Sequence, residues 1–186
     1  MGNYRYLTAS LPSFPAEGPA PFTPDEFRFH CQGVLDAADL ADLSAVLDGR
    51  PGDGQSAFCA AWAAVESQIR NAVAKARGAK LGVEAKPFLK PHKGYRVWID
   101  KGVADALAKP NPLACELALD EVRREAANDL ARECGGGLAD ILAFAVRLRL
   151  AYRWGAMTES AGRAKLDALV DELEKGAAAN GATDFN

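Results

Sequence analysis

The segment NPLACELALDEVRREAANDLARECGGG, residues 111 to 137, restricts the possible fold more than any other. Asn111 is a preferred N-cap residue and Pro112 suits the first helical position, so a helix is predicted to begin there. The glycines at 135 to 137 favour its end. Between these limits one apolar stripe recurs at three- and four-residue spacing, made of Cys115, Leu119, Val122, Ala126 and Leu130. A helix with such a stripe needs partner helices.

The charged residues of this helix have two interpretations. Asp120 lies three and four residues before Arg123 and Arg124, so ion pairs on a solvated surface explain most of the charges. Glu116 and Asp120 are also four apart, a spacing that presents two carboxylates to a metal ion or substrate. The solvated face is the leading interpretation, because no histidine accompanies the pair and Arg124 is placed to neutralise Asp120.

Other segments carry comparable helix signals. FTPDEF combines a Thr23 cap, a Glu26 that completes a capping box, and a Phe22–Phe27 hydrophobic staple. Residues 56 to 77 place apolar side chains on one face, which predicts a long amphipathic helix that Gly78 can cap. Further helices are expected from about 36 to 47, 100 to 109 and 138 to 154, and from a Thr158 cap onward.

Two segments lack a clear helical pattern. Residues 4 to 8 alternate aromatic and polar side chains, which indicates a short strand or an extended segment, and the prolines that follow enforce a loop. Residues 78 to 96 are rich in glycine, proline and basic residues and are predicted to form a partly mobile linker. Its basic residues suit an acidic partner, although a solvated loop is the simpler interpretation.

The segment LADILAFAVRLRLAYRW, residues 138 to 154, is predicted to be the central helix. Ile141 and Leu148 belong to its main apolar stripe, and Leu150 projects from nearly the opposite side, so the helix is expected to be packed on two sides. Arg149 and Arg153 continue the line of other apolar residues. They either extend from the edge of the core into solvent or form a pair that binds a partner protein.

These elements predict an all-α fold, an irregular multi-helix bundle organised as one domain. Its parts are an extended segment (1–22), an N-terminal helical part (23–78), a linker with a short helix (79–110), a C-terminal helical part (111–175) and a frayed tail (176–186). No stretch has the ~20 apolar residues of a membrane span, and no signal peptide is expected, so a cytoplasmic location is predicted.

Composition and motifs exclude several functions. The net charge of −3 argues against general nucleic-acid binding. No phosphate-binding loop, nucleophile elbow or zinc-protease motif is present, so no catalytic residue, cofactor or metal ligand is assigned. The cysteines show no C-x-x-C spacing and are interpreted as buried free thiols rather than a zinc site: Cys31, Cys59, Cys115 and Cys134.

Four stretches together resemble a known family. YRYLTASLPSF, PFTPDEFRFHC, NPLACELALDEVRRE and LAFAVRLRLAYRW, within residues 4 to 154, resemble an uncharacterised bacterial family that accompanies V-type ATPase genes. That family looks like a shortened relative of the ATPase C subunit, which is called d in eukaryotes. The resemblance implies part of the fold of that C subunit, with no nucleotide site and no proton-carrying residue.

The resemblance implies a non-catalytic role that links or scaffolds rotor components. The expected partners are the central-stalk and membrane-ring subunits of a V-type ATPase, which would hold the protein at the inner membrane without inserting it. Permanent subunit, assembly factor and regulator all remain open. The alternatives are a stand-alone helical adaptor and a metal-dependent helical enzyme that uses Glu116 and Asp120. Arg149 and Arg153 are the candidate partner-binding residues.

Overall fold

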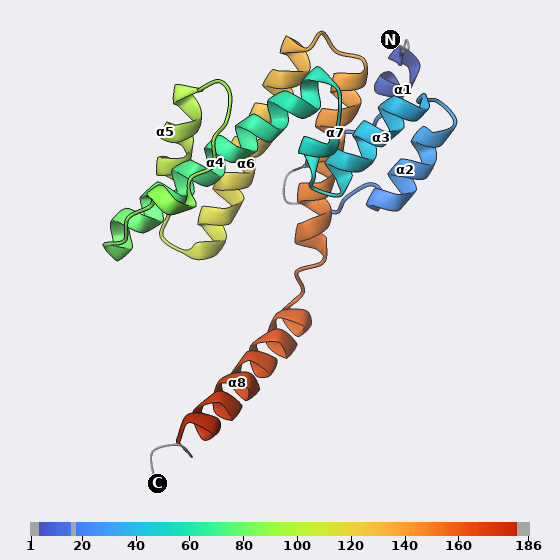
Figure 1. The fold of residues 1–186 in the computed structure, drawn as a ribbon. Coiled ribbons are helices and arrows are strands. Elements are labelled where there is room, and N and C mark those ends of the chain that lie inside the picture. Colours follow the sequence, from blue (N-terminus) through green and yellow to red (C-terminus); the bar gives the residue numbers. More distant parts are fainter. Residues whose placement is uncertain (1–3, 16–17, 182–186) are drawn as a thin grey trace. The chain divides into compact units, whose positions relative to one another are not determined.

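A computed structural model describes residues 4–15 and 18–181, and these residues contain helices and no strand, which confirms the all-α prediction (Figure 1). The chain divides into two compact units, Met1–Tyr152 and Arg153–Asn186. The α-helices are α1 (Arg5–Ser10), α2 (Pro24–Gln32), α3 (Ala37–Leu47), α4 (Ala57–Leu81), α5 (Val97–Leu107), α6 (Pro112–Glu133), α7 (Leu138–Gly155) and α8 (Glu159–Gly181). Two short 3₁₀ helices, η1 (Pro51–Asp53) and η2 (Lys86–Phe88), lie in the connections.

The predicted N-caps of α2 and α6 are confirmed. The Thr23 hydroxyl accepts the backbone N–H of Glu26, whose carboxylate accepts the N–H of Thr23 in return. Phe22 stacks on Phe27 with ring centroids 6.0 Å apart, as a hydrophobic staple requires. At the start of α6 the Asn111 side chain accepts the N–H of Ala114. These local signals place the helix starts correctly because they depend only on residues within one turn.

The core of the first unit forms around α7. Its residues from Ile141 to Val146 are all buried, which confirms a helix packed on more than one side. Phe144 lies 4.8 Å from the ring of Phe27 on α2 and 5.4 Å from that of Phe14. The stripe of α6 is also buried from Leu119 to Leu130, with α4 and α5 packed against that helix.

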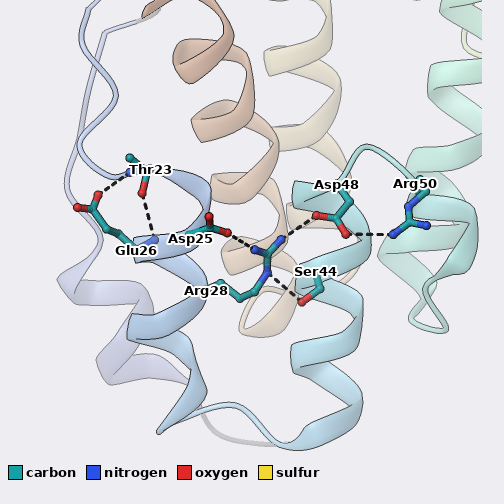
Figure 2. A network of polar contacts seen from close by, with 7 residues as sticks. All are labelled: Thr23, Asp25, Glu26, Arg28, Ser44, Asp48 and Arg50. Carbon is teal, nitrogen blue, oxygen red and sulfur yellow. Dashed lines mark hydrogen bonds and ion pairs between the residues drawn. The ribbon is translucent and has the colours of Figure 1, made fainter. Parts of the chain in front are cut away.

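A polar network joins α2 to α3 and the turn that follows it (Figure 2). The Arg28 guanidinium reaches Asp25 at 2.5 Å on its own helix, Asp48 at 2.7 Å and the Ser44 hydroxyl at 3.2 Å. Asp48 in turn accepts from Arg50 at 3.1 Å. Arg28 therefore fixes the relative placement of two helices that both pack toward the core.

The expected strand or extended segment at residues 4 to 8 is wrong, because α1 begins there. Tyr4, Leu7 and Leu11 share a helical spacing that competes with the alternation of Tyr4 and Tyr6, and Tyr4 is buried while Tyr6 is exposed. The backbone N–H of Thr8 donates to the Tyr4 carbonyl, and the Tyr4 hydroxyl donates to Asp39 on α3. Tertiary burial of Tyr4 and Leu7 thus decides the local conformation.

The predicted end of the long helix is also wrong by one turn. α4 continues past Gly78 to Leu81 and ends at Gly82, whose φ of +66° is the left-handed conformation that glycine favours. Gly78 is needed for close approach instead: an added Cβ would lie 2.7 Å from the carbonyl oxygen of Val83. The returning chain therefore packs directly on the last turns of α4.

The four cysteines are free, and two of them are buried as expected. Cys31 and Cys59 have no exposed surface, and burial raises the pKa of each thiol to about 11. Cys115 and Cys134 are only partly buried. Across the described residues, no helix is both long and apolar enough to cross a membrane.

The second unit contains the last residues of α7 and then α8, which begins directly after Thr158. The Thr158 carbonyl accepts the N–H of Gly162 at 2.9 Å, so Thr158 occupies the N-cap position that the sequence predicts. The apolar residues of α8 whose side chains are described are all exposed: Leu166, Leu169, Val170 and Leu173. They form one stripe with spacings of three and four.

Candidate functional site

Glu116 and Asp120 lie one turn apart on α6, but their carboxylates have different surroundings. Asp120 is buried and pairs with Arg123 at 3.0 Å, whereas Glu116 lies 3.7 Å from Arg77 of α4. The arginine that neutralises Asp120 is thus Arg123 and not Arg124, which pairs with Glu121. Because Asp120 already binds a guanidinium, the pair does not present two free carboxylates to a metal ion.

Arg123 joins α6 to α4 through an ion-pair network that is largely buried. Its Nε lies 3.1 Å from Oε2 of Glu66, and Nη1 lies 3.0 Å from Oδ1 of Asp120. Burial by itself lowers the pKa of Arg123, but the charges and hydrogen bonds of Glu66 and Asp120 outweigh it and raise that pKa. The network fixes the angle between α4 and α6 at the point where a groove opens between them.

This groove, which we call the α4–α6 groove, has a volume of about 590 Å³ and a largely apolar floor. Its apolar wall contains two of the most exposed large hydrophobic side chains of the first unit, Leu81 at 76% and Phe88 at 67%. Its charged rim includes Arg70 and Arg77 from α4 and Glu116 from α6. The lining residues are Arg70, Val73, Ala74, Arg77, Gly78, Leu81, Val83, Glu84, Ala85, Phe88, Glu116, Leu119 and Arg123.

The segment after α4 forms one wall of the groove and is held by two buried amides. The Asn71 side chain accepts the N–H of Lys90 at 2.9 Å and donates to the Lys90 carbonyl at 2.7 Å. Gln68 does the same for Arg96, at 3.0 Å and 2.8 Å. The linker predicted at residues 78 to 96 is therefore held to α4 at two points, which positions η2 and Phe88 beside the groove.

Sequence reasoning missed these two amides because a polar residue on a helix is normally assigned to its solvated face. The sequence does contain a signal for their burial. Gln68 and Asn71 directly precede Ile69 and Ala72, which belong to the apolar stripe of α4. A buried amide that follows the apolar spacing needs backbone partners, and a nearby segment rich in proline and glycine supplies unpaired backbone groups.

Neither candidate partner-binding arginine lies at the groove. Arg149 is exposed, and its guanidinium packs on Gly49, where an added Cβ would clash with Nη2. Arg153 falls in the second unit, with its guanidinium 5.2 Å from the ring of its neighbour Trp154. A role for either arginine in partner binding stays a prediction.

Comparison with known proteins gives no relative for this arrangement. No protein-family model matches the chain, no curated protein matches it, and no solved structure matches its fold. The functional interpretation therefore depends on the sequence motifs and on the geometry of the groove and of α8.

Proposed function

We propose that this chain is a non-catalytic interaction protein of a V-type ATPase, similar to its C subunit, which links or scaffolds rotor components. The observation that carries the proposal is the α4–α6 groove, where exposed apolar side chains lie within a charged rim. Exposed apolar grooves of this kind are typical binding sites for amphipathic helices. The motifs within residues 4 to 154 that resemble the ATPase-associated family direct the choice of partner.

The proposed occupant of the groove is a helix of a central-stalk subunit. Such a helix presents apolar residues at three- and four-residue spacing to Leu81, Val83 and Phe88. Its carboxylates pair with Arg70 and Arg77, whose side chains are 59% and 62% exposed although each already has an acidic neighbour. Binding through the stalk would hold the protein at the cytoplasmic face of the inner membrane.

The stripe of α8 offers a second contact of the complementary kind. Leu166, Leu169, Val170 and Leu173 have the i, i+3, i+4, i+7 spacing of a helix that binds in a groove. The flanking charges of α8 include Asp167 and Asp171 one turn apart. The α4–α6 groove can receive a helix of one partner, and the apolar stripe of α8 can bind in a groove of another. These two features suit a protein that bridges two partners.

The test is affinity purification of the tagged full chain from its own cells in mild detergent, with mass spectrometry of the bound proteins. We expect stoichiometric recovery of central-stalk and membrane-ring subunits. Recovery of stalk subunits without a complete ring would instead indicate an assembly factor. An intact ATPase that stays in the extract while the tagged chain is recovered alone would contradict the proposal and favour a stand-alone adaptor.

A matched pair of variants tests the groove itself. Phe88→Asp places a charge on the groove wall and is expected to abolish recovery of the stalk subunits. Phe29→Asp is the control, because Phe29 is 73% exposed on α2 and lies outside the groove. Equal recovery with both variants would remove the groove as the contact, and circular dichroism would verify that both variants are folded.

A further inference from the structure

The guanidinium of Arg147 on α7 lies beside two aromatic rings and has no polar partner among the described residues. It makes no hydrogen bond and no ion pair with any residue in 4–15 or 18–181, and its Nε is buried. Its guanidinium lies 5.9 Å from the ring centroid of Phe14 and 5.7 Å from that of Phe144. The rings cover one side of the cation, but they leave its N–H donors unused.

The charges around Arg147 do not neutralise it. Burial lowers its pKa, the nearby Arg124 lowers it further, and only Asp140 acts in the opposite direction. Asp140 lies two turns earlier on α7, and its Oδ2 accepts the N–H of Gly137 at 2.9 Å. A guanidinium that is desolvated without an ion-pair partner gains most from an added anion.

The side chain of Arg147 lines a cavity of about 570 Å³ bounded by α1, the chain at residues 11–13, α6 and α7. This volume is in the range of small-molecule sites. The cavity also contains the Ser13 hydroxyl and the Asn128 amide, and neither has a hydrogen-bond partner among the described residues. Ser13 and Asn128 are exposed to solvent, and Arg132, which pairs with Asp129, also lines this space. Leu11, Pro12 and Ala143 are its apolar lining.

We propose that this cavity binds a small organic oxyanion, a carboxylate or phosphate group on a compact body, with Arg147 as the residue that takes the charge. The planar fork of the guanidinium matches two oxygens of either group. The Asn128 amide and the Ser13 hydroxyl supply further donors, and the apolar lining covers the rest of the ligand. The site is separate from the α4–α6 groove and does not depend on the proposed function.

A change at Asp140 tests the proposal because it should strengthen oxyanion binding, whereas loss of Arg147 should weaken it. The Asp140 carboxylate lines the same cavity and repels an anion, so Asp140→Asn is expected to tighten oxyanion binding. An asparagine oxygen can still accept the Gly137 N–H, which preserves the start of α7. A purely structural role of Arg147 over the phenylalanine rings predicts no such gain.

The experiment is a titration of the ¹⁵N-labelled full chain with inorganic phosphate, with succinate and with neutral succinamide, at constant ionic strength. We expect saturable shifts of the amides of Thr8, Ala9, Ser13 and Asn128 with at least one of the two anions and none with succinamide. The anion that saturates at the lower concentration identifies the group as phosphate or carboxylate.

Variants decide whether Arg147 is responsible. Arg147→Met keeps an apolar stem over the rings and should weaken binding roughly tenfold or more, and Arg147→Lys should weaken it less, because the charge remains without the fork. Arg50→Met, at an exposed arginine outside the cavity, is the control and should change nothing. Unchanged affinity in Arg147→Met, or shifts spread over surface arginines, would overturn the proposal. If Arg147→Met does not fold, opposite shifts in affinity for Arg147→Lys and Asp140→Asn decide it.

Discussion

Arg123 is the residue on which the geometry of the α4–α6 groove most depends. It compensates two carboxylates that are themselves mostly buried, Glu66 at 17% and Asp120 at 6% side-chain exposure. Removal of the guanidinium takes this partner from both carboxylates, although Glu66 keeps its ion pair with Arg70 at 3.1 Å. Arg123 therefore links α4 to α6 beside the groove. The sequence indicated it only as a member of an ion pair on the helix surface.

Arg123→Met is expected to lower the free energy of unfolding by about 3 kcal/mol, because it removes the ion pair of the buried Asp120 and the link from Glu66 of α4 to α6. Urea denaturation monitored by circular dichroism measures the change. Arg124→Met is the matched control on the same helix, since Arg124 pairs with a Glu121 that is 65% exposed and should cost under about 1 kcal/mol. Equal losses in the two variants would contradict the special position of Arg123.

The buried thiols of Cys31 and Cys59 predict a loss of stability at alkaline pH. Each folded-state pKa is about 11 against an ordinary 9.0, so the unfolded chain releases these protons first. The contribution of these thiols to the free energy of unfolding is therefore fully present below pH 9. It falls between pH 9 and 11, by about 1 kcal/mol per pH unit for each thiol.

Urea denaturation at pH 8, 9 and 10 tests this dependence on the two thiols. The Cys31→Ala/Cys59→Ala double variant removes both groups and should lose less stability over this interval than the parent chain. Cys115→Ser, at a partly buried position, should follow the parent. Parallel curves for the parent and the double variant would show that other groups cause the alkaline loss.

At the scale of secondary-structure elements, the segment between α4 and α5 depends on α4 for its conformation. Asn71→Ala leaves the N–H and the carbonyl of Lys90 without their partner. The expected cost is about 2 kcal/mol, with faster hydrogen exchange at the Lys90 amide. Ser67→Ala is the control, because that hydroxyl only bonds back to Ala63 of its own helix. Unchanged exchange at Lys90 would mean that the segment holds its shape alone.

The helices that could be predicted from the sequence are those whose signals are local. The starts of α2 and α6 depend on a cap and its neighbours within one turn, so Thr23 and Asn111 identify them directly. α1 could not be predicted, because burial of Tyr4 against Asp39 of α3 overrides an alternating pattern. The end of α4 was missed because Gly78 serves chain packing and Gly82 the helix end.

The candidate sites were harder to predict, because they depend on pairings between distant elements. Glu116 could be selected from its spacing, but its neighbours Arg77 and Phe88 come from α4 and η2. Arg147 could not be selected from the sequence, because nothing in the spacing of residues 138 to 154 marks it as part of a site. Only the approach of residues 11–13 turns it into the charged wall of a cavity.

At the scale of the whole molecule, the apolar residues that are buried, among those whose burial is described, belong to the first unit. Those identified among the described residues extend from Tyr4 to Ala151, and the described apolar side chains of α8 are exposed. The described apolar stripe of α8 is not covered by other residues of its own unit, so it needs another surface to bury it. This distribution predicts that stability and partner binding depend on different parts of the chain.

Truncation after Gly155 separates these two properties. It keeps the whole of α7 and removes residues 156–186, so the free energy of unfolding of the first unit should change by less than about 0.5 kcal/mol, because its core residues are all retained. Urea denaturation of the truncated and full chains measures this difference. A loss above about 1 kcal/mol would mean that residues 156–186 stabilise the first unit.

The stripe of α8 can be tested in the full chain at the same time. Leu166→Asp/Leu173→Asp introduces charges at two exposed positions, so stability should stay unchanged while recovery of ATPase subunits falls. Lys165→Gln/Glu172→Gln changes two exposed polar positions of the same helix that the proposed contact does not include, and it serves as the control. If truncation and the leucine variant both leave recovery intact, the α4–α6 groove alone accounts for partner binding. If both reduce it without loss of stability, the bridging role requires α8.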